Sequence, residues 1–146
     1  MENQNIVKAY YDMKGEFLWS YGKISPFFKE LMENKKIMGT KCPKCGVVFC
    51  PPTSDCPKCW VPTEWIEVGP QGTVLTFTVI HMPNSWSKRS APYTLALVKL
   101  DGADTALLHY IDSTDKEILH RGPRVEAVFA DERKGYVTDI DCFRII

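Results

Sequence analysis

Two identical Cys-Pro-Lys-Cys tetrapeptides constrain this chain more than any other feature. Cys42 and Cys45 form the first pair, Cys56 and Cys59 form the second, and ten residues separate the pairs. Two residues between cysteines let one tight turn direct both sulfurs to one point. Two such turns facing each other supply a tetrahedron of four sulfurs, the geometry that Zn²⁺ accepts without distortion. The spacing therefore predicts a structural zinc site with these four cysteines as ligands.

The choice between a metal site and disulfides depends on the compartment. The start, MENQNIVKAYYD, lacks a basic region followed by an apolar run, and no stretch approaches the ~20 apolar residues of a membrane span. We therefore expect a cytoplasmic protein, in which cysteines stay reduced. Iron suits four thiolates as well as zinc does, so a rubredoxin-like electron carrier is an alternative. Because four sulfurs leave no open position, a zinc ion here would not activate water.

The two remaining cysteines and a tryptophan complicate this pattern. Cys50 lies between them without a partner at two-residue spacing, and we interpret it as a loop thiol. Cys142 ends an apolar alternating stretch and is interpreted as a buried hydrophobic residue. Gly46 follows the first pair, where a left-handed backbone is often needed, but Trp60 follows the second pair. The two turns therefore need not be equivalent.

Three segments are expected along the chain. Residues 1–35 form an N-terminal helical segment, in which Ser25-Pro26 is a helix start with serine as N-cap. Residues 36–63 form the zinc ribbon. From residue 64 to 146 the apolar period changes to two, which indicates a β domain. Its five expected strands, separated by Gly- and Pro-containing turns, lie near residues 75–79, 93–98, 106–111, 124–130 and 136–143. Five strands of this length favour a small, partly open OB-fold barrel, with a split SH3-like barrel as an alternative.

The charge balance bears on possible partners. Lys and Arg number 18, as do Asp and Glu, so the formal net charge is zero. Zinc ribbons and OB-fold barrels both occur in proteins that bind single-stranded nucleic acid, which makes such binding the alternative function. The neutral charge argues against it, because nucleic-acid binding depends on a basic surface.

The order of these pieces resembles a known family. A helix runs into a strand at residues 36–41, two C-P-x-C-type turns follow, and then come G-x-V-x-x-F-T at residues 72–78 and P-Y-x-x-A-L-V at residues 92–98. Together they resemble the small zinc-ribbon and OB-fold proteins associated with acyl-CoA enzymes, long catalogued as a domain of unknown function. The resemblance covers about residues 22–146. Trp60 and Cys50 depart from the family pattern, and neither departure removes a ligand.

The resemblance implies a mainly β protein with an N-terminal α-helix, a rubredoxin-like zinc ribbon and a five-stranded OB-fold barrel. It also implies a non-catalytic accessory subunit, in a hetero-oligomer with a thiolase-superfamily catalytic subunit, that contributes to CoA or acyl-CoA binding. More narrowly, the chain resembles the small subunits of aromatic acyl-CoA thiolases. On this reading the catalysis, an acyl transfer, belongs to the complex and not to this chain alone.

Residues that could perform chemistry are few. His81 and His109 fall in or beside expected strands and are interpreted as structural, and His120 lies by a turn. Acidic side chains at residues 112, 115 and 117 are interpreted as a solvated loop. The segment at residues 83–90 interrupts the β domain; as a CoA contact, its Lys88 and Arg89 would meet phosphates while Trp86 stacks on adenine. A surface loop without a ligand is the alternative for this segment.

Overall fold

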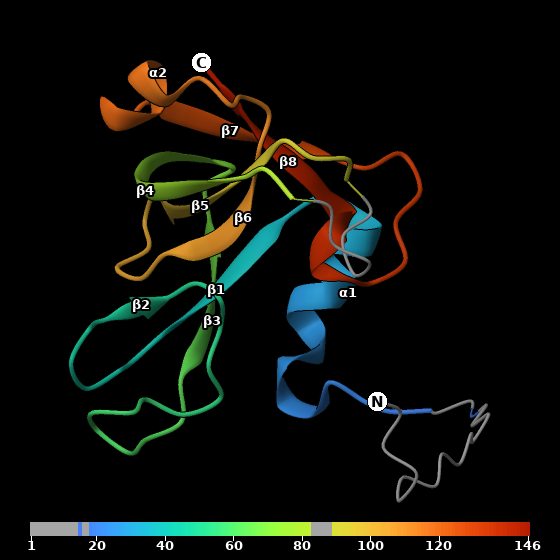
Figure 1. Cartoon of the computed structure of the whole chain (residues 1–146). Coiled ribbons are helices and arrows are strands. Elements are labelled where there is room, and N and C mark those ends of the chain that lie inside the picture. Colours follow the sequence, from blue (N-terminus) through green and yellow to red (C-terminus); the bar gives the residue numbers. More distant parts are fainter. Residues whose placement is uncertain (1–14, 16–17, 83–88) are drawn as a thin grey trace, which may run out of the picture.

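The computed structural model describes residues 15, 18–82 and 89–146. One α-helix leads into a small antiparallel sheet, and a closed barrel follows (Figure 1). The helical elements are η1 (Gly22–Ile24), α1 (Ser25–Asn34), α2 (Lys116–His120) and η2 (Val137–Asp139). The strands are β1 (Ile37–Lys41), β2 (Val48–Phe49), β3 (Glu64–Val68), β4 (Gln71–Ile80), β5 (Tyr93–Leu100), β6 (Leu107–Ile111), β7 (Arg124–Phe129) and β8 (Ile140–Ile145). Within the described ranges no helix is long and apolar enough to cross a membrane.

Helix α1 begins where the Ser-Pro pair predicts, but with a different cap. Ile24 occupies the N-cap position, while Ser25 lies inside the first turn and its hydroxyl donates to the Gly22 carbonyl at 2.7 Å. Lys35 ends the helix in the left-handed conformation at φ 55°. Residues 1–14, 16 and 17 of the predicted helical segment lie outside the described residues. The side chains that α1 buries are those of Phe27 and Leu31.

The three strands of the ribbon form a sheet in the order β2-β1-β3, antiparallel throughout. Gly39 lies at the centre of β1, where a Cβ atom would stand 2.8 Å from the carbonyl oxygen of Phe49. Only glycine allows β2 to approach this closely. The division of the chain after residue 63 stays a prediction; β3, on the barrel side of that boundary, pairs with β1 of the ribbon along its whole length.

The barrel closes in the order β4-β5-β6-β8-β7, with β7 paired back to β4. This order, with a helix between the third and fourth strands, is the OB-fold topology that the sequence predicts. The expectation of a partly open barrel is wrong, because residues 71–73 pair with residues 124–126 and complete the ring. Gly72 sits at this closure, paired with Leu100 on one side and Val125 on the other.

Two short helical elements in the barrel were not predicted. The acidic stretch interpreted as a loop contains α2, and the carboxylate of Asp115 caps it by accepting from the amides of Glu117 and Ile118. The last predicted strand starts later than expected, because residues 137–139 form η2 and β8 begins only at Ile140. A single turn after an Asp cap is too short to give an apolar periodicity, so only the cap itself signalled α2.

Helix, ribbon and barrel share one hydrophobic core. Buried side chains from α1, β1, β2 and β3 belong to the same cluster as those that fill the barrel. Two hydrogen bonds link β2 to the β5–β6 loop: the Val48 amide donates to the Asp104 carboxylate at 2.9 Å, and the Asp104 amide donates back to the Val48 carbonyl at 2.8 Å. The Cys50 amide likewise donates to the Thr105 hydroxyl at 2.8 Å. The ribbon is therefore held in a fixed orientation against the barrel.

Candidate functional site

The four cysteines of the tetrapeptides come together at the end of the ribbon. Their sulfur atoms all lie within 4.8 Å of one another, and those of Cys45 and Cys56 are 3.8 Å apart. A tetrahedral zinc ion with Zn–S bonds of about 2.3 Å requires sulfurs about 3.8 Å apart, so the spacing fits this ion. Cys42 and Cys56 are buried, while Cys45 and Cys59 are half-buried. The donor set consists of sulfur alone and surrounds the centre, which suits a structural ion.

The two turns that carry these cysteines have equivalent backbones, although the sequence left this open. In each, the amide of the first cysteine donates to the carbonyl five residues later at 2.9 Å. The amide four residues later donates back to the first cysteine's carbonyl, at 2.9 Å from Gly46 and 2.8 Å from Trp60. Both residues adopt a left-handed backbone, with φ 77° at Gly46 and φ 55° at Trp60. A bulky residue thus adopts the conformation that glycine provides in the first turn.

Electrostatics of the cluster agree with a cation site. Burial opposes ionisation of Cys42, but hydrogen bonds from the amides of Cys45 and Lys44 and from neighbouring thiols lower the pKa of Cys42 to about 6. Burial, together with hydrogen bonds to the other thiols, raises the pKa of Cys59 to about 12. The protein groups alone therefore favour only part of the ionisation that zinc ligation requires. A divalent cation at the centre supplies the missing positive charge.

The other two cysteines lie outside the cluster. Cys50 is fully buried in the core shared by ribbon and barrel, and burial raises the pKa of its thiol to about 12. Cys50 thus lies in the loop after β2, as expected, and its thiol is buried and inert. Cys142 is buried on β8, as expected, and burial also raises its pKa.

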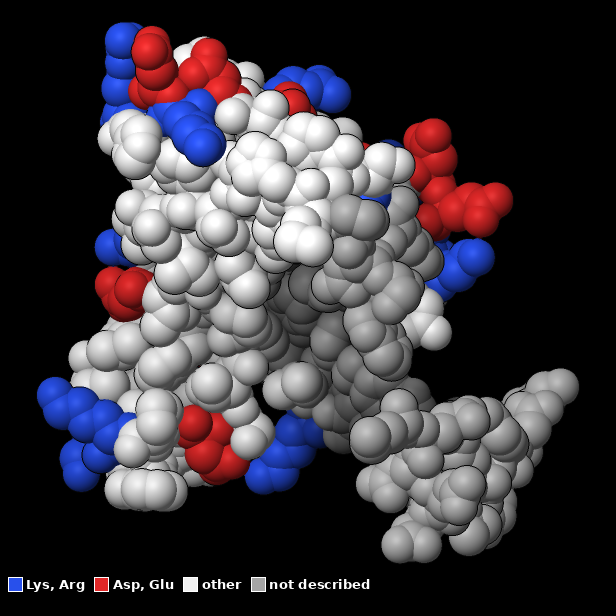
Figure 2. All heavy atoms as spheres, in the orientation of Figure 1, with Lys and Arg blue, Asp and Glu red and all other residues white. Residues whose placement is uncertain are grey.

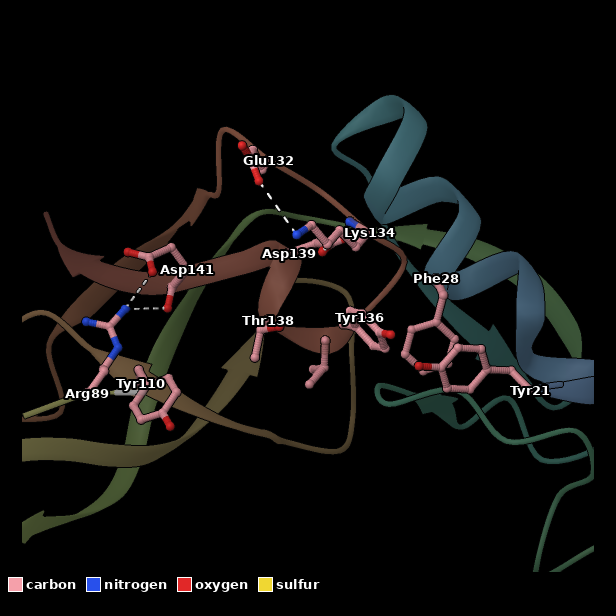
Figure 3. Close-up of a pocket in the computed structure, with 11 residues that line it drawn as sticks. Tyr21, Phe28, Arg89, Tyr110, Glu132, Lys134, Tyr136, Thr138, Asp139 and Asp141 are labelled. Carbon is pink, nitrogen blue, oxygen red and sulfur yellow. Dashed lines mark hydrogen bonds and ion pairs between the residues drawn. The ribbon is translucent and has the colours of Figure 1, made fainter. Parts of the chain in front are cut away.

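A cavity of about 890 Å³ opens between α1 and the barrel (Figure 3). Arg89, one of the three predicted CoA contacts, lines it; Trp86 and Lys88 lie outside the described residues. The guanidinium of Arg89 donates to the carboxylate of Asp141 at 2.8 Å and lies 4.7 Å from the ring centre of Tyr110. Figure 3 shows this group at one end of the cavity and the stacked rings of Tyr21 and Phe28 at the other. The remaining lining residues are Glu132, Lys134, Tyr136, Val137, Thr138 and Asp139.

The histidines are arranged as structural residues. His109 is buried on β6, where its Nδ1 accepts from the Tyr110 amide at 2.9 Å and its Nε2 lies 3.2 Å from the Val137 carbonyl. This pattern assigns the proton to Nε2, and burial lowers the pKa of the ring, so His109 is neutral at pH 7. His81 and His120 are exposed, and the ring of His120 packs edge-on against Phe77.

An exposed apolar surface on the barrel was not predicted. Leu97 on β5 pairs with Leu108 on β6, and Leu75 forms the bulge of β4 beside them. Leu75 and Leu108 are each 57% exposed and Leu97 is 36% exposed. We call these three residues the leucine face. In the view of Figure 2, charged side chains stand mainly at the margins and a broad uncharged area covers the barrel.

Family models match two consecutive parts of the chain. Residues 34–64 match a model described as ChsH2, rubredoxin-like zinc ribbon domain. Residues 65–130 match a model described as ChsH2, C-terminal OB-fold domain.

Curated relatives cover most of the chain. A DUF35 domain-containing scaffold protein of Methanocaldococcus jannaschii is 30% identical over 104 residues, which are 70% of this chain and 73% of the relative. One from Pyrococcus furiosus is 30% identical over 107 residues, 73% of this chain and 77% of the relative. One from Methanothermobacter thermautotrophicus is 28% identical over 109 residues, 73% of this chain and 81% of the relative.

Solved structures share the fold. A structure named Ltp2-ChsH2(DUF35) aldolase superposes with a TM-score of 0.64 at 21% identity, over 83% of this chain and 92% of that one. A DUF35 family protein of unknown function from Sulfolobus solfataricus superposes with a TM-score of 0.60 at 26% identity, over 85% of this chain and 84% of that one. These superpositions agree with a zinc ribbon followed by an OB-fold barrel.

Proposed function

This chain belongs to the family of DUF35 domain-containing scaffold proteins, and from that premise we propose that it is a non-catalytic subunit of an acyl-CoA-processing enzyme. Its partner is a catalytic subunit of the thiolase superfamily. The names of the curated relatives support a scaffold role, and the resemblance noted in the sequence supports the acyl-CoA enzyme. The chain organises the complex, and the chemistry is performed by the larger subunit.

The leucine face is the observation that carries this proposal. One side of a small antiparallel barrel normally meets water and carries polar side chains. Here three strands place leucines side by side on the outside, where they are left in contact with water. Contiguous exposed apolar residues of this kind mark protein interaction sites. A subunit that is permanently assembled would keep this surface covered.

The same surface argues against nucleic-acid binding. OB folds bind oligonucleotides on the face of their second and third strands, which here are β5 and β6. That face carries Leu97 and Leu108, which supply neither positive charge nor a flat ring for a base. A neutral net charge points the same way. A protein partner fits these strands better.

Association with the catalytic subunit can be tested on the leucine face. We expect the tagged chain to co-purify from its native host with one larger protein, and Leu97→Lys combined with Leu108→Lys to reduce the recovered partner at least tenfold, because two charges would be desolvated in the contact. Ile118→Lys on α2 is the matched control, since Ile118 is 40% exposed but lies outside the leucine face. Mass spectrometry of the recovered proteins gives the readout. A wild-type chain recovered alone as a stable monomer contradicts the proposal.

Two further parts of the proposal concern bound groups. We propose that Cys42, Cys45, Cys56 and Cys59 hold a structural zinc ion, which the four-sulfur geometry supports. We also propose that the segment with Trp86, Lys88 and Arg89 contributes to CoA or acyl-CoA binding in the complex. Arg89 and Lys134 both line the cavity, where they pair with Asp141 and Glu132, so a phosphate would replace or share these carboxylate contacts.

CoA binding is tested on the assembled complex. Lys88→Ala and Arg89→Ala are each expected to weaken binding of free CoA about tenfold, because each removes one charge-assisted contact to a phosphate. Isothermal titration of the complex with CoA measures the change. Lys116→Ala, on α2 and outside the cavity lining, is expected to leave affinity unchanged. Equal affinities for all variants would contradict the CoA contact while leaving the subunit role intact.

A further inference from the structure

Trp60 combines two features that are individually unfavourable. Its backbone is left-handed at φ 55°, a conformation that strains any residue with a Cβ atom. Its side chain is 84% exposed, so the indole gains little from packing on its own chain. Neither feature helps this subunit fold by itself. Strained residues that lack a folding role are found where a protein binds something.

The first cysteine turn supplies the internal comparison. Gly46 occupies the position equivalent to Trp60, makes the equivalent hydrogen bond at 2.9 Å, and adopts φ 77° without strain. The turn therefore needs a left-handed residue but not a large one. A Cβ atom at Gly46 would meet nothing within 4 Å, so both tips project into open space. The tryptophan is thus an addition to a turn that is complete without it.

The surroundings of Trp60 indicate the chemistry of what it contacts. Lys44 and Lys58 take matching places in the two turns, and both are exposed. Across the part of the chain that the structure describes, no ion pair engages either lysine. Figure 2 shows blue side chains at the end of the ribbon, on the side where β2 and β3 lie in Figure 1, with red side chains between them. A large exposed ring, with one exposed lysine in its own turn and another in the matching turn, fits an apolar pocket with an acidic rim.

The backbone that supports the indole ring is also suited to an anchor residue. Backbone hydrogen bonds fix the turn on both sides, from Trp60 to the carbonyl of Cys56 at 2.8 Å and from Cys56 to the carbonyl of Val61 at 2.9 Å. The ribbon beneath is joined to the barrel by a common core. A tryptophan presented on so rigid a support loses little conformational freedom on binding. Tryptophan is also among the residues most enriched at the energetic centres of interfaces.

We propose that Trp60 is an anchor that inserts into an apolar pocket with an acidic rim on the catalytic subunit, with Lys44 and Lys58 meeting the rim. This inference rests on the proposed function, because it requires that partner. It adds a second contact area besides the leucine face. Trp60 lies at the end of the ribbon, whereas the leucine face lies on the barrel. The strain at Trp60 is retained because the ring is needed in the complex.

The decisive variant is Trp60→Gly, which is expected to change stability and association in opposite directions. The free chain should have a Tm no lower than wild type, because glycine relieves the left-handed strain. The Kd for the purified partner subunit should rise about 30-fold, as for a residue at the centre of an interface. Trp60→Phe should recover most of the affinity. Combining Lys44→Gln with Lys58→Gln should weaken the dependence of Kd on salt concentration.

Lys35→Gly is the matched control. Among the described residues other than glycine, Lys35 and Trp60 have a positive φ, 55° in each case, and Lys35 lies at the end of α1. The substitution Lys35→Gly should relieve backbone strain to a similar extent without changing the Kd for the partner. If Trp60→Gly bound the partner with an unchanged Kd, the anchor role of Trp60 would be wrong. Formation of the wild-type complex would still support the proposed function in that case. A lower Tm in Trp60→Gly would overturn the anchor role too, since the ring would then serve the fold. Binding of oligo(dT) by the wild-type chain that is lost in Trp60→Gly would assign the tip to nucleic acid instead.

Discussion

Cys56→Ser is expected to abolish zinc binding and to unfold the ribbon. Cys56 is buried and its sulfur lies 3.8 Å from that of Cys45, so serine would remove one of four ligands and leave a hydroxyl in its place. Zinc contributes on the order of 10 kcal/mol to the folding of small zinc modules, which is comparable to the ~5–15 kcal/mol that stabilises a whole domain. Zinc content per chain and thermal unfolding, each with and without a chelator, measure the effect.

The spare cysteines supply the control for this experiment. Cys50→Ala and Cys142→Ala each remove a thiol of a buried cysteine without touching the four-sulfur cluster. Both should retain one zinc per chain and lose only the modest stability expected from a smaller core side chain. If Cys50→Ala lost the metal while Cys56→Ser kept it, the assignment of the ligands would be wrong. A purified wild-type chain that holds iron would instead favour the electron carrier.

Gly72→Ala is expected to prevent closure of the barrel. Its loss of stability should be the second largest among the proposed variants. A Cβ atom at Gly72 would stand 2.5 Å from the carbonyl oxygen of Lys99 and 3.0 Å from the Cα atom of Leu100. Both are backbone atoms at the end of β5, so no side chain can rotate away, and β7 pairs with Gly72 from the other side. Forced overpacking of this kind costs about 3 kcal/mol or more. The corresponding fall in Tm is about 10 °C.

Gly69→Ala is the paired control for the barrel. A Cβ atom there would approach no closer than 3.5 Å, to the Cβ atom of Asp101, which is ordinary contact. Gly69 does not adopt a positive φ, so its backbone conformation does not penalise alanine. Its Tm should therefore stay close to that of the wild type. Equal losses in the two variants would mean that the close approach of β4 and β5 at Gly72 is not what limits closure.

The metal cluster and the fold class could be predicted because both depend on local spacing. Two residues between cysteines define a turn regardless of what surrounds it, and the alternation near residues 93–98 defines a strand in the same way. The burial of Cys50 could not be predicted, since it depends on packing in a core that the barrel shares and that includes residues more than fifty positions away in the sequence. The equivalence of Trp60 and Gly46 was missed because sequence statistics disfavour a left-handed tryptophan.

The leucine face shows a different limit. A period of two separates the residues of β5 into two sets, but each set is mainly apolar with one polar member, Lys99 or Thr94, so the pattern only weakly indicates which one faces the core. The structure buries the smaller set, with Ala96 and Val98, and exposes Leu97. The bulge at Leu75 then shifts the register of β4 by one residue. Four consecutive apolar residues at positions 95–98 were the available signal that the outer face of β5 is apolar as well as the inner one.

The core common to the ribbon and the barrel has a consequence for selectivity. It holds the ribbon sheet against the barrel, and the cysteine turns pack around their own smaller cluster at the end of that sheet, so the separation between Trp60 and the leucine face is restricted. Once one area engages a surface, the other is held beside it at a high effective concentration, and two modest contacts act as one strong one. That gain is available only to a surface with matching sites at the same separation, so geometry itself excludes other enzymes.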